Sequence, residues 1–305
     1  MKTIKPLVTV GIPTYNRNQI LLDTIKQLLL QTYESYEVIV ADQTEQPAPD
    51  TLKAIEALVK KDSRLRYFRI TPANLPAARN FIIQKAKGQL ILFIDDDIQV
   101  GSQFIANHVT EHQVHPEVDV VAGRIVQKGM PLSNFALYFN KYGLPQGTFN
   151  CPDSLPCTYF PGGNHSVSIE ALKQISGYYT GYQKNAVREE SDAAFRLHNA
   201  GYKMFFSSKA ALIHLSAPQG GSRIHNHQFD NPRFYINDLL FALRTVKIYY
   251  LPLALFRRLR IYTGGQGIVV RFRRVVLFAG CFFVALWYYL FNRTNQVAQE
   301  VSEIT

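Results

Sequence analysis

A three-layer α/β sandwich with a mostly parallel central sheet is the fold class that the sequence predicts. Over residues 5–126, short apolar segments alternate with longer segments in which apolar residues recur at helical spacing. Such alternation is typical of parallel strands joined by helical crossovers. The segment Leu90–Ile94 is apolar at every position, as expected of a central strand that helices cover on both faces.

The elements follow one another in a regular order. We expect strands at 7–12, 37–41, 66–70, 90–94 and 118–126, and helices at 19–31, 52–61 and 76–86. The first helix presents Ile25, Leu28 and other apolar residues on one broad face. Many prolines make residues 127–165 a predicted loop region. Short helices are expected at 169–175 and 189–200, each followed by a glycine, Gly177 or Gly201.

Composition and charge narrow the class of protein. The 305 residues are 47% hydrophobic, which is enough for one large domain or two smaller ones. Three cysteines are too few for a disulfide framework and indicate a reducing compartment. The net charge of +10 is concentrated in residues 239–299, which hold nine basic residues and no acidic one, among many Phe, Leu, Val and Tyr residues. This pattern indicates a membrane surface, and no nucleic acid, as the partner.

Residues 231–305 are therefore predicted to form a basic, apolar, helical tail that associates with a membrane. Residues 234–262 suggest a pair of in-plane amphipathic helices broken at Pro252. As a helix, the uncharged stretch Val275–Phe291 would be about 26 Å long, slightly less than a hydrocarbon core of about 30 Å. It either spans the membrane once, lies in its surface, or packs at a domain or dimer interface. The preceding basic cluster Arg271–Arg274, with no secretory signal at the N-terminus, predicts the cytoplasmic face.

Three polar clusters follow predicted strands: Pro13–Tyr15, Asp42 and Asp95–Asp97. Because ligands bind at the carboxyl ends of the strands in α/β sheets, we expect these clusters to meet in one crevice. Three consecutive carboxylates at the end of a buried strand repel one another unless a cation neutralises them. Carboxylate oxygens suit Mg²⁺ or Mn²⁺, so the sequence predicts a divalent-ion site here.

Five segments in order and register resemble a known family. They read VTVGIPTYNR at 8–17, VIVADQT at 38–44, NLPAARN at 74–80, LILFIDDDI at 90–98 and REESDAAFRL at 188–197. Together they look like the family 2 glycosyltransferases, which are inverting enzymes of the GT-A nucleotide-sugar fold. The resemblance implies a catalytic domain at 1–230. Residues 1–126 would be its nucleotide-sugar-binding half, and residues 127–230 its acceptor-binding and base half.

The resemblance also implies roles in donor binding. Pro13, Thr14 and Tyr15 would line the nucleotide pocket, with the Tyr15 ring beside the base. Asp42 would accept a hydrogen bond from the base, which suits uracil or thymine. Arg79 would pair with the pyrophosphate or a base edge. Taken alone, Asp42 fits a turn residue equally well, Arg79 a solvated helix residue, and Tyr15 a core aromatic residue.

The acidic cluster receives its roles from the same resemblance. Asp95 and Asp96 would hold the ribose and support the metal site. Asp97 would ligate a Mg²⁺ or Mn²⁺ ion that bridges the diphosphate, and His214 would complete the ligand set. A purely structural His214 is the alternative for that residue.

The segment Glu189–Asp192 resembles the family's Glu-Asp-x-Asp pattern, whose second carboxylate is the base. Glu190 occupies that position, and because Glu is one methylene longer than Asp, Asp192 is a rival candidate. The acceptor hydroxyl needs a base because it loses a proton as it attacks the anomeric carbon. Acidic residues in a first helical turn can also simply complement the helix dipole. Gly162–Asn164 resembles the loop before the acceptor helix, and Gly220–Arg223 suggests a loop over the diphosphate. Taken alone, each segment fits a plain solvated turn equally well.

These observations predict an inverting glycosyltransferase of polysaccharide or cell-envelope biosynthesis. It would move a sugar from a nucleotide-sugar donor, with UDP favoured, to a glycan or lipid-linked acceptor at a membrane. No Gln-x-x-Arg-Trp motif follows the base, which favours transfer of one sugar per encounter. One alternative is a sugar-nucleotidyltransferase, although the segment Gly11–Asn16 has a single glycine. The other is a non-catalytic relative that binds a nucleotide sugar or a membrane partner.

Overall fold

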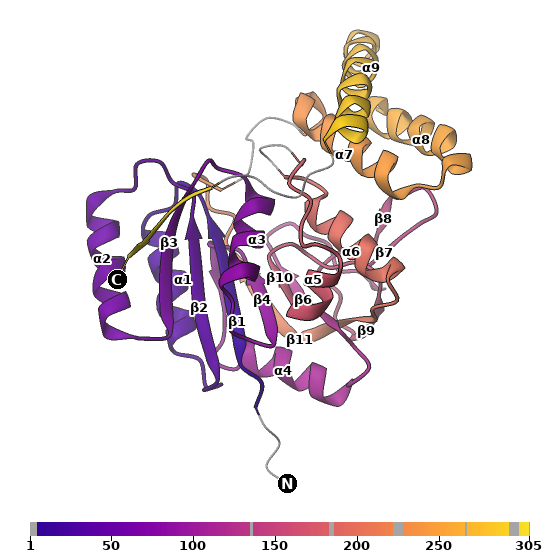
Figure 1. Ribbon diagram of the computed structural model, residues 1–305. Coiled ribbons are helices and arrows are strands. Elements are labelled where there is room, and N and C mark those ends of the chain that lie inside the picture. The colour runs from indigo at the N-terminus through magenta and orange to yellow at the C-terminus, as the bar shows by residue number, and fades with distance from the viewer. Residues whose placement is uncertain are drawn as a thin grey trace.

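The computed structural model describes residues 5–134, 137–182, 186–221, 228–265, 267–292 and 299–304. Within these residues, ten strands form a central sheet with helices on both faces, and a further group of helices lies at one end (Figure 1). This arrangement is the α/β sandwich with a helical tail that the sequence predicts.

The central sheet is mixed but mostly parallel. Its strands stand in the order β12-β3-β2-β1-β4-β10-β6-β11-β5, and β9 pairs with β11 beside this row. Parallel pairs join β1 to β2 and β4, β2 to β3, and β6 to β11, whereas β10 runs antiparallel to β4 and β6. The strands are β1 Val8–Thr14, β2 Tyr36–Asp42, β3 Leu65–Thr71, β4 Leu90–Ile94, β5 Ile98–Gln99, β6 Val120–Val126, β9 Leu155–Cys157, β10 Asn164–Ser168, β11 Met204–His214 and β12 Glu300–Ile304. A separate pair consists of β7 Tyr138–Phe139 and β8 Pro145–Gln146.

Each face of the sheet carries its own apolar core. Side chains of α1, α2 and α4 pack on one face, and those of α3, α5 and α6 pack on the other. In β2, Val38 and Val40 belong to the first core while Ile39 and Ala41 belong to the second. Strands buried on both sides therefore need apolar residues at every position. The helices are α1 Gln19–Leu29, α2 Pro49–Lys61, α3 Leu75–Lys85, α4 Phe104–Val114, α5 Ile169–Gln174 and α6 Glu189–Asn199.

Strand β10 was not predicted from the sequence, and its first two residues lie in the region 127–165 that was predicted as loop. Only Val167 of its five residues is apolar, so its composition carries no strand signal. Its polar side chains are buried with partners: His108 of α4 lies 3.0 Å from both the Asn164 Oδ1 and the Ser166 Oγ. These hydrogen bonds replace the apolar contacts that a central strand normally makes.

The tail contains α7 Pro232–Thr245, α8 Leu251–Thr263 and α9 Ile268–Phe291, which share an apolar core. The break between the first two helices was predicted at Pro252, but this position is wrong. The break lies at Val246–Tyr250, before Pro252. Pro252 fits the first turn of α8, where its missing N–H has no helical partner to lose. Helix α9 begins before the uncharged stretch and includes the basic cluster Arg271–Arg274.

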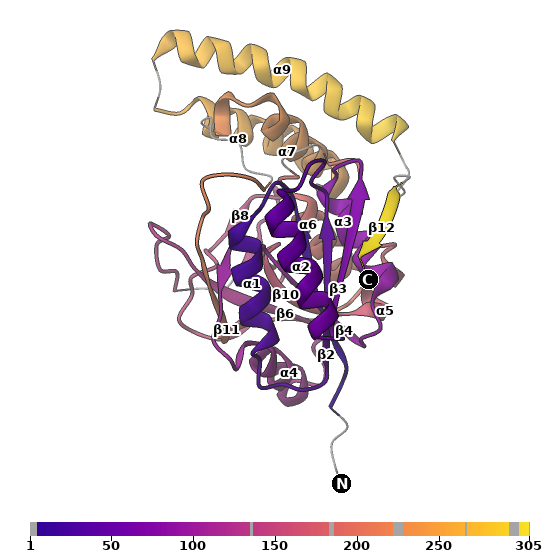
Figure 2. The same cartoon turned by 90° about the vertical axis from the view of Figure 1, so that its left-hand side faces the viewer.

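Strand β12 corrects the expectation of a tail that is helical throughout. It pairs antiparallel with β3, with Glu300 opposite Thr71 and Ile304 opposite Tyr67. Figure 2 shows α9 lying lengthwise over α7 and α8, with β12 below one end of the helix, beside the sheet. This strand forms because its backbone hydrogen-bonds to the open edge of the sheet. The sequence of its five residues alone therefore does not predict it. The tail is thereby attached to the nucleotide-binding half predicted from the sequence.

Candidate active site

A cavity of about 430 Å³ opens at the carboxyl ends of β1 and β4. The predicted residues Pro13, Thr14, Tyr15, Asp95–Asp97 and His214 all contribute to its wall. The remaining lining residues include Arg17, Gln43, Glu45, Asn74, Gly221 and Arg233. The polar clusters after these strands thus meet in one crevice, as the strand order requires.

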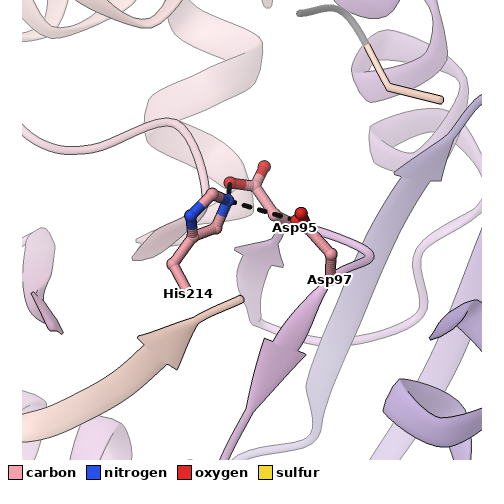
Figure 3. A group of neighbouring side chains, drawn as sticks. All are labelled: Asp95, Asp97 and His214. Atoms are coloured by element: carbon pink, nitrogen blue, oxygen red, sulfur yellow. Dashed lines mark ion pairs between the residues drawn. The ribbon is translucent and has the colours of Figure 1, made fainter. Parts of the chain in front are cut away.

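Asp95, Asp97 and His214 form a compact group of potential metal ligands in this wall (Figure 3). Their ligand atoms all lie within 4.8 Å of one another. The Nε2 of His214 is 3.1 Å from the Asp97 Oδ1 and 3.6 Å from the Asp95 Oδ2. Asp97 is buried, while 39% of the Asp95 side chain is exposed toward the cavity. Two carboxylates and an imidazole fit a divalent ion such as Mn²⁺ or Mg²⁺, with room for further oxygen ligands from a substrate.

Arg17 is the buried cation of this acidic cluster. Its Nε donates to the Asp96 Oδ1 at 3.0 Å, and its Nη2 to the Asp97 Oδ2 at 3.2 Å. It also donates to the backbone carbonyl of Gln219. Arg17 is the last residue of the motif VTVGIPTYNR, and its role was not predicted from the sequence. Its role could have been predicted from its position. It is a basic residue just after a strand that ends beside three carboxylates.

Both carboxylate oxygens of Asp96 accept hydrogen bonds from residues that are not potential metal ligands. The hydroxyl of Thr14 donates to its Oδ2 at 2.6 Å, and Arg17 holds its other oxygen. Burial raises the pKa of Asp96 to about 7, against the opposing effects of Arg17 and Thr14. For Asp97, burial is outweighed by the hydrogen bond and charge of His214, which lower the pKa. Asp95, which was predicted to hold the ribose and support the metal site together with Asp96, instead lies with Asp97 and His214 in the group of potential ligands.

The segment after β11 packs over the end of β1. The N–H of Gly221 donates to the Tyr15 carbonyl at 2.7 Å. At Gly220 the φ angle is +76°, and an added β-carbon would lie 2.1 Å from the carbonyl oxygen of Asn16. Glycine is therefore required for this close approach. Ser222 and Arg223, the other half of the predicted loop over the diphosphate, lie outside the described residues.

Two predicted donor-binding residues do not line the cavity. The Asp42 carboxylate is buried and accepts hydrogen bonds from the Thr44 N–H, at 2.8 Å, and from the Tyr67 hydroxyl. Its neighbours Gln43 and Glu45 line the cavity. A hydrogen bond from Asp42 to a base would require these internal contacts to rearrange.

Arg79 is occupied in a buried ion pair with Glu189. Its Nη2 also donates to the Gly162 carbonyl at 3.0 Å, and its guanidinium lies over the rings of Phe93 and Tyr178. The side chain therefore fixes the Gly162 loop to the start of α6. The pairing with pyrophosphate that the resemblance implies would need this ion pair to open.

The two candidate bases have different surroundings. Glu190 is half-buried at the start of α6, and its Oε1 accepts hydrogen bonds from the Tyr159 hydroxyl and the Ser191 hydroxyl. Asp192 is buried, and Arg196 and Arg244 each donate to one of its oxygens at 2.7 Å. Burial opposes ionisation of Asp192, but these two arginines lower its pKa. Asp192 is thus held in an ion-pair network that links α6 to α7.

The glycine pair Gly162–Gly163 connects the base region with the metal-ligand group. A β-carbon on Gly162 would lie 3.6 Å from the Glu190 Cβ, and one on Gly163 would lie 2.1 Å from the Asp95 Oδ2. Neighbouring residues of one loop therefore contact the two carboxylate sites, although these are distant in sequence. Glycine is needed for space at position 163, since a β-carbon there would overlap the Asp95 carboxylate, whereas a β-carbon on Gly162 would meet Glu190 at ordinary contact distance.

The chain that carries this cavity and metal-ligand group also matches a known family in sequence. A model described as "Glycosyl transferase family 2" matches residues 9–175, more than half of the chain. The chain belongs to glycosyl transferase family 2.

Curated relatives of this chain are also named glycosyltransferases. A GalNAc(5)-diNAcBac-PP-undecaprenol beta-1,3-glucosyltransferase of Campylobacter jejuni is 22% identical over 243 residues, which are 77% of this chain and 75% of that protein. The family 2 chain spans about a quarter of the length of the first curated relatives it matches, uncharacterized glycosyltransferases of Rickettsia.

Two solved structures share the GT-A fold with this family 2 chain. One is a mannosyltransferase from Pyrobaculum calidifontis in complex with GDP-Man and Mn²⁺, with a TM-score of 0.57 at 15% identity over 96% of this chain and 89% of that one. The other is GalNAc-T7 with UDP, GalNAc and Mn²⁺, with a TM-score of 0.67 at 15% identity over 94% of this chain and 58% of that one. The predicted fold class is confirmed.

Proposed function

We propose that this family 2 glycosyltransferase transfers a sugar from a nucleotide-sugar donor, with UDP favoured, to a hydroxyl group of a glycan or lipid-linked acceptor, with inversion at the anomeric carbon. The observation that carries the proposal is the Gly162–Gly163 loop, which contacts Glu190 on one residue and Asp95 on the next. A base on one side of the reacting carbon and a diphosphate site on the other is what direct displacement needs.

The proposed mechanism uses Glu190 as the base. Its carboxylate accepts the proton of the acceptor hydroxyl as that oxygen forms a bond to the anomeric carbon. The bond from this carbon to the diphosphate breaks in the same step, and the nucleoside diphosphate leaves with the electron pair. Tyr159 and Ser191 donate to the Oε1 of Glu190, which orients the carboxylate and directs its Oε2 to the acceptor.

Asp95, Asp97 and His214 would hold a Mn²⁺ or Mg²⁺ ion. When bound, the ion supplies positive charge beside the departing diphosphate. Thr14 and Tyr15 would contact the nucleotide, and Arg17 would keep Asp96 and Asp97 oriented through its two hydrogen bonds. In this proposal Arg79 and Asp42 do not contact the donor directly. Arg79 positions the Gly162 loop, and Asp42 positions the end of β2.

The apolar tail and one curated relative support a proposal for the acceptor and for the place where it is reached. In the described residues one helix, α9, is long and apolar enough to cross a membrane. The Campylobacter relative is named for an undecaprenol-linked substrate. We propose a lipid-linked or glycan acceptor, reached at the cytoplasmic face of a membrane, and one sugar added per encounter.

The test is release of nucleoside diphosphate from a panel of nucleotide sugars, with Mn²⁺, Mg²⁺ or EDTA, on the full chain in detergent. Membrane extract supplies the acceptor. We expect release from one donor that depends on the metal and is lost in Asp97→Ala. Donor binding without release would overturn transfer in favour of a non-catalytic nucleotide-sugar-binding protein. Binding of no donor would overturn the nucleotide-sugar site itself.

A further inference from the structure

Helix α9 has two apolar faces, and only one of them is covered by protein. Its inward face places Arg274, Cys281 and Ala285 in buried positions against the rest of the tail. Its outward face exposes large apolar side chains at helical spacing along the whole element, for example 84% of Ile268, 72% of Phe272 and 69% of Phe283. The members of this outward row are Ile268, Phe272, Val276, Phe283, Trp287, Leu290 and Phe291. A contiguous apolar surface of this length indicates an apolar partner.

Both ends of α9 are attached to the same globular body. Near its start, Arg274 donates to the Tyr262 carbonyl at 2.8 Å and pairs with Asp230 at 3.3 Å. At its end, the Asn292 carbonyl accepts a hydrogen bond from the Tyr179 hydroxyl. Beyond α9 the chain returns to the central sheet, where β12 pairs with β3. Figure 2 shows the helix lying over α7 and α8 along its length.

This attachment is incompatible with a helix that crosses a bilayer. Crossing would put the two ends of α9 on opposite sides of a hydrocarbon core about 30 Å thick. The residues 293–299 would then have to lead back to β3, and seven residues reach at most about 25 Å when fully extended. The contacts of Asn292 and β12 would both be lost.

The positive charge of the tail favours one kind of partner. Arg257, Arg260 and Arg271 are exposed on α8 and at the start of α9, and residues 239–299 contain no acidic residue. A second copy of this surface would bring like charges together, whereas anionic lipid headgroups would be attracted to it. Aromatic residues such as Trp287 also suit the headgroup level.

We propose that α9 lies in the plane of an anionic membrane surface, with its outward row at the boundary between headgroups and acyl chains, and that it does not span the membrane. This inference deepens the membrane part of the proposed function and names the partner as anionic lipid. It needs neither a particular donor nor catalysis. Both ends of the helix, and the active site, stay on one side of the bilayer.

Co-sedimentation with lipid vesicles tests the partner. We expect the full chain to bind vesicles that contain phosphatidylglycerol, and to bind pure phosphatidylcholine vesicles at least tenfold less. The double variant Phe283→Glu and Trp287→Glu should lose binding of anionic vesicles. The control is Val114→Glu, which places a single negative charge on an apolar residue that is 65% exposed on α4, far from α9 (Figure 1). Equal binding by the double variant and the control would overturn the proposal.

Accessibility of single cysteines tests the topology. Lys53→Cys on α2 and Glu303→Cys on β12 lie at exposed positions, whereas Cys151, Cys157 and Cys281 are buried. In spheroplasts of cells that express the chain, a membrane-impermeant maleimide should label neither introduced cysteine until the membrane is opened. Labelling of Glu303→Cys alone in intact spheroplasts would mean that α9 spans, and would overturn the proposal.

The oligomeric state separates lipid from a second copy as the partner. Light scattering in solution should show that the double variant is a monomer. It should stay dispersed in the absence of vesicles. A stable dimer of the unmodified chain that the double variant abolishes, without vesicle binding, would overturn the lipid assignment. Release of nucleoside diphosphate, measured on the same preparations, tests the proposed chemistry independently of lipid binding. If the chemistry is wrong, this release is absent even where vesicle binding succeeds.

Discussion

Gly163 lies so close to Asp95 that any side chain at this position would displace a potential metal ligand. An added β-carbon would be 2.1 Å from the Asp95 Oδ2. We expect Gly163→Ala to weaken Mn²⁺ binding by about 10–100-fold, the range typical of changes that reorient a metal ligand. Titration calorimetry with Mn²⁺ measures this directly. Gly101→Ala is the control, because its β-carbon would contact nothing within 4 Å; equal affinity in both variants would contradict the prediction.

Glu190 and Asp192 can be distinguished by what each substitution removes. Glu190→Gln should lower kcat by about 10²–10⁴-fold with little change in the KM for the donor, because it removes a base without disturbing a buried network. Asp192→Asn should instead lower the free energy of unfolding by about 3–5 kcal/mol, since it leaves Arg196 and Arg244 without their carboxylate. Steady-state kinetics and urea unfolding on both variants provide the comparison. A stable but inactive Asp192→Asn, beside an active Glu190→Gln, would make Asp192 the base.

The part of the site that follows strands was predictable from the sequence, and the part made by contacts between distant segments was not. Asp95–Asp97 come directly after an apolar strand, so their meeting with Thr14 follows from the sheet topology alone. The pairing of Arg79 with Glu189 joins residues 110 positions apart in the sequence. Nothing in the local pattern of either residue distinguishes an internal ion pair from a ligand contact.

At the scale of elements, Asp238 ties the base-bearing helix to the tail. Located on α7, it accepts from the Arg188 Nε at 2.6 Å, just before α6, and from the Arg258 Nε of α8 at 2.8 Å. Burial opposes its ionisation, but the two arginines lower the pKa of Asp238 to about 2. Asp238→Asn would leave two buried guanidinium groups without a charge partner.

We therefore expect Asp238→Asn to lower the free energy of unfolding by about 3–5 kcal/mol. Urea denaturation followed by circular dichroism gives the value. Asp62→Asn is the matched control: its partner Arg64 is 2.6 Å away but partly exposed, so the loss should stay within about 1 kcal/mol. Similar losses in the two variants would show that the buried network does not stabilise the contact of α6 with the tail.

The contact of α4 with β10 should make stability depend on pH. Burial lowers the pKa of His108 to about 3, with the nearby His112 acting in the same direction, whereas an unfolded histidine has a pKa of about 6.5. Between these values the unfolded state binds more protons, so the free energy of unfolding falls as the pH falls below about 6.5. By pH 5 this one residue accounts for about 2 kcal/mol.

Replacement of His108 by glutamine removes this titration while keeping an amide that can hydrogen-bond to Ser166. The loss of unfolding free energy between pH 7.5 and pH 5, measured by urea denaturation, should be about 2 kcal/mol smaller in His108→Gln than in the unmodified chain. An unchanged loss would mean that His108 titrates alike in the folded and unfolded states, and would contradict the prediction.

Helices and strands with a regular spacing of apolar residues were predictable from the sequence, and those without it were not. Strand β4 and helix α1 have the expected spacing of apolar residues and lie where the sequence indicates. Strands β10 and β12 were missed because their stability comes from partners: buried side-chain hydrogen bonds in one, and the backbone of β3 in the other. A pattern confined to five polar-rich residues cannot reveal either cause.

At the scale of the whole molecule, the tail is an integral part of the folded structure. Removal of residues 231–305 would take away Asp238, Arg244 and Arg258, and would expose the edge of β3. We expect the remaining chain, 1–230, to aggregate or to unfold without a cooperative transition, as judged by solubility and thermal circular dichroism. A soluble 1–230 fragment that still binds a nucleotide sugar would contradict this expectation.

The return of the chain to the sheet through β12 therefore decides how a freely soluble form of this enzyme can be made. Shortening the chain would remove the residues that hold α6, and with them the orientation of Glu190. Replacing the outward side chains of α9 by polar ones changes only the lipid-facing surface and keeps the ion pairs and β12 in place. We therefore expect that resurfacing the helix, without cutting the backbone, gives a water-soluble form of this protein with its fold intact.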